Sequence, residues 1–510
     1  MTTEYPRRSV LKATAITAGV GLLGRFAQAG ELTASDYQSL DAWAMAEAVH
    51  RGELSPEALL EAALTRKALV DPRIGAVNML HEEYARALLA RRRAAGQQAR
   101  GALAGVPLLL KDLNTSLQDT ITSNGSRFFK NAAPATATST LIARYEHAGA
   151  VPFGKTTCPE FGLTTTTESL AWGQTRNPWN TGHSAGGSSG GAAAAVAAGI
   201  VPVAHATDGG GSIRIPASYC GLVGLKPGRY RTPSGPAHFE GWFGASVGHV
   251  VSRSLRDTAL FLDAGHGHEP GSAYWTAPPE RPYREELQRD PGRLRIAVVR
   301  HSLTGAPLEP AIAATLEQTL KQLGGLGHEL EELNLGIDPR QLFAAHGTVI
   351  GTALLSLVHE REQLLGRAAD GADLERITRV VLERAQGARA EDLYRARQSF
   401  ESIGAAMEQH FQRFDLILSP VTANLTPPLG LLSLDQDWDS YARHAMGSAG
   451  FTVLANVSGQ PAISLPLGMS DNGLPVGMMF TASLGGEGLL LRLASQLEQD
   501  TPWAGRRAPL

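Results

Sequence analysis

The chain has 510 residues, of which 43% are hydrophobic and 19% are charged, so it has the composition of a globular protein with a large core. Its formal net charge of -3 argues against the basic surface by which proteins bind nucleic acid or an anionic membrane. Its two cysteines, Cys158 and Cys220, lie in apolar or glycine-rich surroundings. We therefore expect two buried free thiols and no disulfide framework.

The first thirty residues are typical of an export signal. Arg7 and Arg8 precede an apolar, uncharged run from Ala13 to Gly24, and Ala27-Gln28-Ala29 follows. A charged segment, a short apolar segment and an Ala-x-Ala site make a secretory signal, and the paired arginines resemble the twin-arginine class. The alternative is an amphipathic helix or an uncleaved anchor. We expect residues 1–29 to direct export to the periplasm, and residues 30–510 to form one domain without membrane contact.

Strands and helices alternate along the rest of the chain. Ser55 before Pro56 has the character of a helix N-cap, and apolar residues at helical spacing follow it. Further helices are predicted at 82–97, 138–147, 311–326 and 488–498, and strands at 106–110, 150–154, 200–206, 294–299, 416–418, 462–465 and 476–480. This alternation predicts an α/β class with a largely buried central sheet.

Two segments in the second half have another character. Residues 270–292 are rich in proline, glutamate and arginine, which predicts a surface excursion. Residues 340–412 predict charged helices at the periphery of the fold.

A stretch rich in glycine and serine carries the chemical information. Ser188 lies in Gly186-Gly187-Ser188-Ser189-Gly190-Gly191, and an alanine-rich run that predicts a helix follows. Ser212 comes some 24 residues later and directly follows three glycines. Consecutive glycines can turn successive N–H groups toward one point, as an oxyanion hole requires. A flexible linker and a phosphate-binding loop fit less well, because the stretch runs into apolar elements and lacks the phosphate-loop motifs.

Lys111 is the candidate base for a serine nucleophile. It ends the apolar run Val106-Pro107-Leu108-Leu109-Leu110, where burial would lower its pKa and favour the neutral amine. The alternative is a structural ion pair with the adjacent Asp112.

Taken together, these stretches resemble the amidase signature family. The resemblance spans roughly residues 35–505 and rests on residues 105–112, 186–191, 210–217, 221–227, 458–468 and 473–477. It implies one large mixed central β-sheet covered by helices on both faces, with a variable substrate-facing section at about 270–450. It also implies a serine amidohydrolase that cleaves a carboxylic amide through an acyl-enzyme, without a metal or another cofactor.

The resemblance assigns a role to each site residue. Lys111 would be the general base, Ser188 the bridging serine after a cis peptide bond, and Ser212 the acylated nucleophile. The N–H groups of Gly209, Gly210, Gly211 and Ser212 would form the oxyanion hole. Ser189 would add a hydrogen bond, and Asp208 with Arg214 would be a supporting polar pair.

Substrate selectivity is less well determined by the sequence. Residues 166–180 resemble the branch that contains the 6-aminohexanoate-cyclic-dimer hydrolases, which points to aliphatic or lactam-like amides, and Trp172 lies in this stretch. His183 stands where an arginine is usual, Gly209 where a bulkier residue is common, and Met479 where a polar residue is frequent. We expect Trp172, His183 and Met479 near the pocket. The expected partner is a small amide or a short peptide amide, and the sequence is compatible with a homodimer.

Two alternatives remain open. Gly186-Gly187-Ser188-Ser189-Gly190 also fits the nucleophile motif of α/β-hydrolases, which would make Ser188 the nucleophile of an esterase with a histidine such as His205 or His249. An amidotransferase-type subunit would share the core and need partner chains, and the export signal argues against it.

Overall fold

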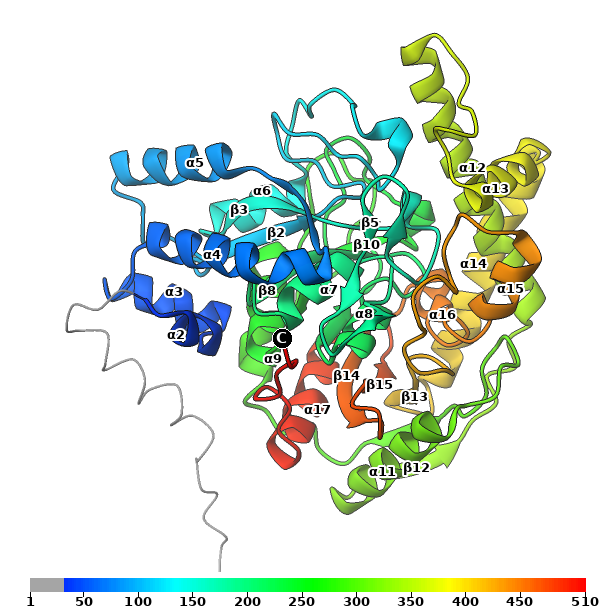
Figure 1. Cartoon of the computed structure of the whole chain (residues 1–510). Helices are drawn as coiled ribbons and strands as arrows, with labels where there is room; N and C mark the ends of the chain where they lie inside the picture. Colours follow the sequence, from blue (N-terminus) through cyan, green and yellow to red (C-terminus); the bar gives the residue numbers. More distant parts are fainter. Residues whose placement is uncertain (1–31) are drawn as a thin grey trace, which may run out of the picture.

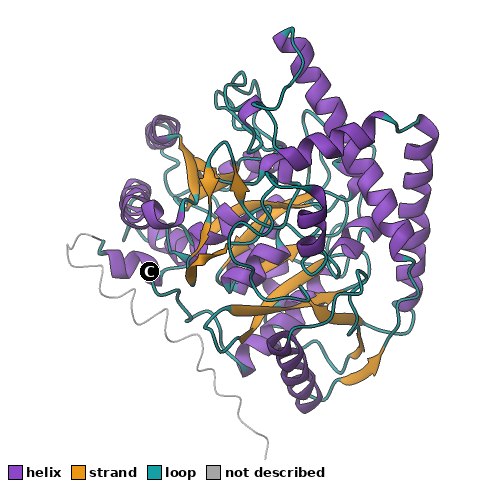
Figure 2. Cartoon of the chain, turned by 45° about the vertical axis from the view of Figure 1, so that its right-hand side comes forward, coloured by secondary structure: helices purple, strands orange, loops and turns teal. Residues whose placement is uncertain are grey.

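Residues 32–510 are described by a computed structural model, shown in Figure 1. The predicted export signal at residues 1–29 lies outside the described residues. An 11-stranded sheet runs through the described part in the order β1-β3-β2-β8-β10-β9-β14-β15-β13-β11-β12. Figure 2 shows helices on both sides of this sheet. The sheet is mixed, since β2 is parallel to β3 and β8, whereas β10, β9, β14 and β15 are joined by antiparallel pairs.

The strands are short and mostly buried. The large sheet consists of β1 (Val77–Leu80), β2 (Pro107–Lys111), β3 (Val151–Thr156), β8 (Val203–Asp208), β9 (Val223–Lys226), β10 (Val247–Ser252), β11 (Arg295–Val298), β12 (Glu329–Glu332), β13 (Leu416–Pro420), β14 (Ala462–Met469) and β15 (Pro475–Thr481). Two small two-stranded sheets pair β4 (Glu168–Ser169) with β5 (Gly173–Gln174), and β6 (Arg176–Asn177) with β7 (Asn180–Ser184).

Helices form the outer layers. They are α2 (Ala34–Ser39), α3 (Ala42–His50), α4 (Pro56–Ile74), α5 (Glu82–Ala94), α6 (Thr140–His147), α7 (Gly190–Ala197), α8 (Arg214–Cys220), α9 (Leu255–Gly265), α10 (Tyr283–Glu286), α11 (Pro310–Gly325), α12 (Pro339–Leu365), α13 (Arg376–Gln386), α14 (Ala390–His410), α15 (Trp438–Ala445), α16 (Val453–Ser458) and α17 (Glu487–Asp500). Short 3₁₀ turns are η1 (Arg127–Phe129), η2 (Glu160–Gly162) and η3 (Trp242–Gly244).

Most predicted elements are present within a few residues of their predicted bounds. Ser55 caps α4 as predicted, because its side chain accepts a hydrogen bond from the Ala58 N–H at 3.1 Å. Strands β9 and β10 were not predicted, since glycines interrupt their apolar pattern. Both cysteines are buried and free, as expected.

The segment at residues 340–412 differs from its prediction. Its first helix, α12, has 27 residues and is apolar and long enough, by composition alone, to cross a membrane. In the structure this helix packs against α13, α14, α16 and η3. The helix lies at the edge of the molecule (Figure 1) and reaches the glycine loop described below, but it is apolar over much of its length, so the prediction of a charged helix was wrong for it.

Candidate active site

Lys111 and Ser188 meet in the interior of the protein. Lys111 is the last residue of β2 and is fully buried, and its Nζ lies 2.7 Å from Ser188 Oγ. The same Nζ donates to Thr207 Oγ1 at 2.9 Å and lies 3.4 Å from the Thr207 carbonyl oxygen. Strand β8, which carries Thr207, is the parallel neighbour of β2. The lysine amine is thus held by Ser188, which lies just before α7, and by the end of β8.

Burial dominates the electrostatics of this lysine. Desolvation lowers the pKa of Lys111 to about 8, although the Cys158 thiol and the Asp208 carboxylate favour its charged form. The alternative ion pair with Asp112 is absent from the described residues. Asp112 instead accepts hydrogen bonds from the Ser123 N–H at 2.8 Å and from Asn78 Nδ2 at 2.7 Å. Successive strand residues point to opposite faces, which separates the two side chains.

The segment around Ser188 has the backbone that the resemblance implies. The Gly187–Ser188 peptide bond is cis. Ser188 and Ser189 are buried directly before α7, and Ser189 Oγ donates to the Thr207 carbonyl at 3.1 Å. Gly187 is tightly enclosed, since a Cβ there would lie 2.2 Å from the Thr166 carbonyl oxygen. Only glycine fits this close backbone approach.

Asp208 organises the loop between β8 and α8. Its carboxylate accepts hydrogen bonds from the N–H groups of Gly211 at 2.8 Å and Ile213 at 3.0 Å. It also pairs with Arg214, whose Nη2 lies 2.9 Å from Asp208 Oδ1, and both side chains are fully buried. Burial alone would raise the pKa of Asp208, but the Arg214 guanidinium holds it well below its usual range. The two residues are therefore a buried ion pair that shapes the loop.

Residues from the C-terminal part of the chain complete this network. Asn456 Nδ2 donates to Asp208 Oδ1 at 2.8 Å, and Arg214 Nη2 donates to Asn456 Oδ1 at 2.6 Å. Arg214 Nη1 donates to the Thr452 carbonyl at 2.9 Å and contacts Met479 Sδ at 3.3 Å. Sequence reasoning missed Thr452 and Asn456, because each lies more than 230 residues from the loop and shows no local motif.

Three of the four predicted oxyanion donors have free N–H groups. Among the described residues, the N–H groups of Gly209, Gly210 and Ser212 have no hydrogen-bond partner, nor does the Ser212 hydroxyl, and Ser212 is half-buried. Gly211 departs from the prediction, because its N–H is bound to Asp208. Its φ of 129° turns this one N–H inward to the carboxylate. The set of available donors is therefore Gly209, Gly210 and Ser212.

The carbonyl groups of the loop are also held. His346 Nε2 on α12 lies 2.8 Å from the Gly209 carbonyl oxygen, and Thr452 Oγ1 donates to the Gly210 carbonyl at 2.7 Å. In a trans peptide the C=O and the following N–H point in opposite directions. The contact from His346 therefore orients the Gly210 N–H away from α12. His346 was also missed, since a single histidine in a helical segment carries no signal of its own.

The three predicted pocket residues lie in different surroundings. Trp172 donates to Ser123 Oγ at 2.8 Å, and Lys130 Nζ lies 4.2 Å from the centre of its ring. His183 on β7 forms a β-bridge with Pro428, and burial lowers its pKa. Met479 is buried on β15 against Arg214. Met479 thus supports the ion pair through Arg214, which the sequence did not predict.

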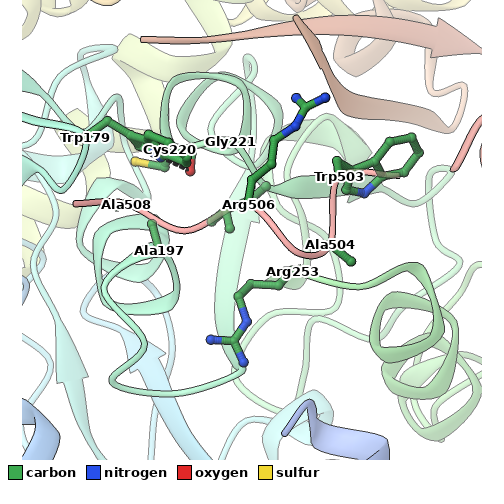
Figure 3. A pocket seen from close by; sticks show the side chains of 10 residues that line it. Trp179, Ala197, Cys220, Gly221, Arg253, Trp503, Ala504, Arg506 and Ala508 are labelled. Carbon is green, nitrogen blue, oxygen red and sulfur yellow. Dashed lines mark hydrogen bonds between the residues drawn. The ribbon is translucent and has the colours of Figure 1, made fainter. Parts of the chain in front are cut away.

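Two cavities of the described part are candidates for the pocket. One, of about 400 Å³, is lined mainly by apolar residues, which come from α14, α16 and the segment before it, β13, β15 and the segments after β11 and β12, and it includes Met479. The other, of about 260 Å³, lies beside the C-terminal segment and is lined by Trp179, Arg253 and Trp503 among others (Figure 3). Neither lining includes Lys111, Ser188 or Ser212.

Comparison with known proteins agrees with this arrangement. The sequence model of the Amidase family matches residues 58–491. Proteins named 6-aminohexanoate-cyclic-dimer hydrolase from Paenarthrobacter ureafaciens and from Pseudomonas sp. (strain NK87) are each 38% identical to this chain over 482 residues. Each alignment covers 92% of this chain and 96% of the relative.

Solved structures show the same fold. The structure of a 6-aminohexanoate cyclic dimer hydrolase complexed with substrate superposes with a TM-score of 0.86 at 37% identity, covering 93% of this chain and 99% of that one. A bacterial aryl acylamidase of the amidase signature family superposes with a TM-score of 0.81 at 27% identity, covering 92% and 99%. The chain therefore belongs to the amidase signature family and is a hydrolase that acts on amides.

Proposed function

We propose that this protein cleaves a carboxylic amide C–N bond through an acyl-enzyme on Ser212, with Lys111 as the base and Ser188 as the proton relay. The observation that carries the proposal is the 2.7 Å contact between Lys111 Nζ and Ser188 Oγ. A neutral amine has two N–H groups and one lone pair. Because the Thr207 oxygens lie where the N–H groups can bind, the lone pair is left for the Ser188 hydroxyl.

The proposed cycle consumes one water molecule for each amide bond that it hydrolyses. Lys111 takes the Ser188 proton, Ser188 takes the Ser212 proton, and Ser212 Oγ bonds to the carbonyl carbon. The C–N bond then breaks, and the leaving nitrogen receives a proton from Ser188, which Lys111 replaces. Water next repeats the attack with the same relay and releases the carboxylic acid. All groups return to their initial state.

The loop stabilises the oxyanion that forms in each half of the cycle. The developing charge would accept hydrogen bonds from the N–H groups of Gly209, Gly210 and Ser212. The Gly211 N–H would instead hold the loop in shape through its bond to Asp208. Removing one such donor typically costs about 10²–10³ in rate. The network of Asp208, Arg214 and Asn456 would keep these donors in place before substrate arrives.

We propose an uncharged linear or cyclic amide as substrate, of the size of a small molecule or a short peptide amide. The support is the likeness to 6-aminohexanoate-cyclic-dimer hydrolases and to an aryl acylamidase. A panel of lactams, aliphatic amides, aryl amides and C-terminal peptide amides tests this. The purified single chain should cleave at least one class, and a requirement for partner chains would favour the amidotransferase alternative.

Labelling with a fluorophosphonate tests the nucleophile. We expect the label on Ser212 and its loss in Ser212→Ala, whereas Ser188→Ala and Lys111→Ala should keep the fold and slow labelling strongly. A label on Ser188 would contradict the proposal and favour an α/β-hydrolase type. His205 and His249 argue against that type, because both are buried and the structure pairs neither with Ser188.

We also propose that residues 1–29 export the protein to the periplasm as a twin-arginine substrate. The support is the pattern of paired arginines, apolar run and Ala-x-Ala site. Cell fractionation with the full chain and with Arg7→Lys/Arg8→Lys tests it. We expect the wild type in the periplasm and the variant in the cytoplasm, and an unchanged distribution would contradict the proposal.

A further inference from the structure

The glycine at position 209 makes room for an aromatic ring. A Cβ at Gly209 would lie 2.4 Å from Trp242 Cζ3 and 2.7 Å from Trp242 Cε3, which is inside the range of real contacts. Gly209 has no left-handed φ, so its backbone would accept any residue. The reason for glycine here is therefore the indole ring. That ring lies beside the residue that carries one of the three free N–H donors of the loop.

His346 and Arg397 contact the turn that carries Trp242. Its ring meets the His346 ring edge-on, with centroids 6.2 Å apart, and His346 binds the Gly209 carbonyl. Trp242 and Phe243 have φ values of 50° and 52°, a strained conformation for bulky residues. Arg397 supports this turn, since its guanidinium lies 5.4 Å from the Phe243 ring centre. Trp242 is half-buried.

The two sides of the reacting carbonyl have different neighbours. Ser188 Oγ lies beside η2, where a Cβ at Gly162 would approach it to 3.0 Å. In the proposed cycle the leaving nitrogen takes its proton from Ser188, so the amine faces η2. Gly209 is instead bordered by η3 and α12 through Trp242 and His346. In the proposed geometry the acyl group, which stays bonded to the carbonyl, extends from the oxyanion loop toward Trp242.

We propose that Trp242 is the wall of the acyl pocket and limits the length and branching of the acyl group. An indole face offers apolar contact to methylene or aryl groups and no partner for a carboxylate. The pocket would thus disfavour acyl groups that carry a negative charge and would limit their size. This inference rests on the proposed function, because it assumes the acyl-enzyme on Ser212.

Substrate selectivity tests the wall directly. We measure kcat/KM for p-nitroanilides with acetyl, butanoyl, hexanoyl, octanoyl and pivaloyl groups. In Trp242→Ala, the ratio of octanoyl or pivaloyl to acetyl should rise by about tenfold or more, and Trp242→Phe should fall between. Trp43→Ala is the matched control, because Trp43 is 38% exposed on α3 and contacts Arg256. If the ratio of octanoyl or pivaloyl to acetyl in Trp242→Ala stays within about twofold of the wild-type ratio, Trp242 does not limit the acyl group and the proposal is wrong.

A double variant tests the contact between the two residues. Gly209→Ala alone collides with the indole and should lower kcat/KM by about 10²-fold or more, as loss of an oxyanion donor does. Gly209→Ala/Trp242→Ala should recover at least about tenfold of that loss. If the double variant keeps the wild-type Tm but recovers none of the lost kcat/KM, the collision with Trp242 is not the cause of the loss in Gly209→Ala. If the acyl selectivity of Trp242→Ala is unchanged while the fluorophosphonate still labels Ser212, only the role of Trp242 is refuted. A fluorophosphonate label on another residue refutes the proposed function.

Discussion

At the scale of single residues, the site depends on groups whose charge is set by burial. Lys111, Lys155 and Lys226 are all buried lysines, and desolvation lowers the pKa of each, to about 8, 8 and 7. Only Lys111 is placed against a serine of the relay; Lys155 binds the Thr115 carbonyl, and Lys226 binds the Pro227 carbonyl. Geometry, and not the pKa alone, therefore singles out the base.

The pKa of Lys111 predicts the pH dependence of activity. Protonated Lys111 cannot accept the Ser188 proton, so kcat/KM should rise with pH up to about 8 and level off above it. A pH profile of kcat/KM between pH 5 and pH 10 measures this. Lys155→Met and Lys226→Met should keep the position of the rising limb. Disappearance of the limb in either of them, with activity retained, would show that the limb reports that lysine and not Lys111.

His346 is expected to position the Gly210 N–H through the Gly209 carbonyl. His346→Leu should lower kcat by about 10-fold or more with little change in KM, because the oxyanion forms only after substrate binds. His346→Gln keeps a donor and should recover part of the rate. Equal losses in both variants, or a loss confined to KM, would contradict this role. Steady-state kinetics on one amide decides between the outcomes.

At the scale of elements, one turn carries most of the site. Strand β8 ends at Asp208, the loop provides the donors and the nucleophile, and α8 begins at Arg214. Because Asp208 and Arg214 bracket the loop and pair with each other, the strand and the helix fix its path. Helix α16 lies behind it and adds Asn456, with Thr452 just before the helix.

Gly211 is expected to be the most sensitive position of this turn. Its φ is 129°, and a Cβ would lie 2.4 Å from Thr452 Oγ1. Gly211→Ala should therefore displace the loop and lower kcat by about 10²-fold or more. Gly473→Ala is the control, because Gly473 also has a positive φ, of 73°, but no atom within 4 Å of its Cβ. It should cost only about 1 kcal/mol of stability and leave kcat unchanged. Similar kcat values in both variants would contradict the prediction.

At the scale of the whole molecule, the described residues form four hydrophobic cores, and one continuous sheet joins two of them. The first core includes Leu109 on β2, and the second includes Ile463 on β14, both fully buried. The site lies where the strands of the first core end, while Asn456 comes from the C-terminal part of the chain. Docking of the two parts is therefore needed to complete the loop network.

This continuity predicts cooperative unfolding. Leu109→Ala and Ile463→Ala should each lower the free energy of unfolding by about 2–5 kcal/mol, as large-to-small core changes do. Both should shift the same single calorimetric transition. Leu364→Ala, at a side chain that is 75% exposed, is the control and should shift it little. Two transitions, each moved by only one variant, would show that the cores unfold independently.

Much of the fold could be predicted from sequence, because its signals are local. The N-cap Ser55, the apolar strand before Lys111 and the alternation of elements each follow from periodicity or capping. Strands β9 and β10 were missed, since glycines break their pattern and only pairing with neighbouring strands makes them strands. The contact of α12 with the glycine loop was missed for a similar reason, because His346 lies 137 residues from Gly209 in the chain.

The sequence by itself determined the family, the two serines at their fixed spacing, the lysine at a buried strand end and the glycines between them. These depend on backbone freedom and on burial of neighbouring residues, which are visible locally. Only the tertiary structure decided that the Gly211 N–H binds Asp208 and that Gly209 faces Trp242. It also decided that His346 and Thr452 hold the loop carbonyls. Except for the short-range bond from Gly211 to Asp208, which depends on the backbone angles of the loop, these contacts join residues far apart in the chain, and no local pattern encodes such a pairing.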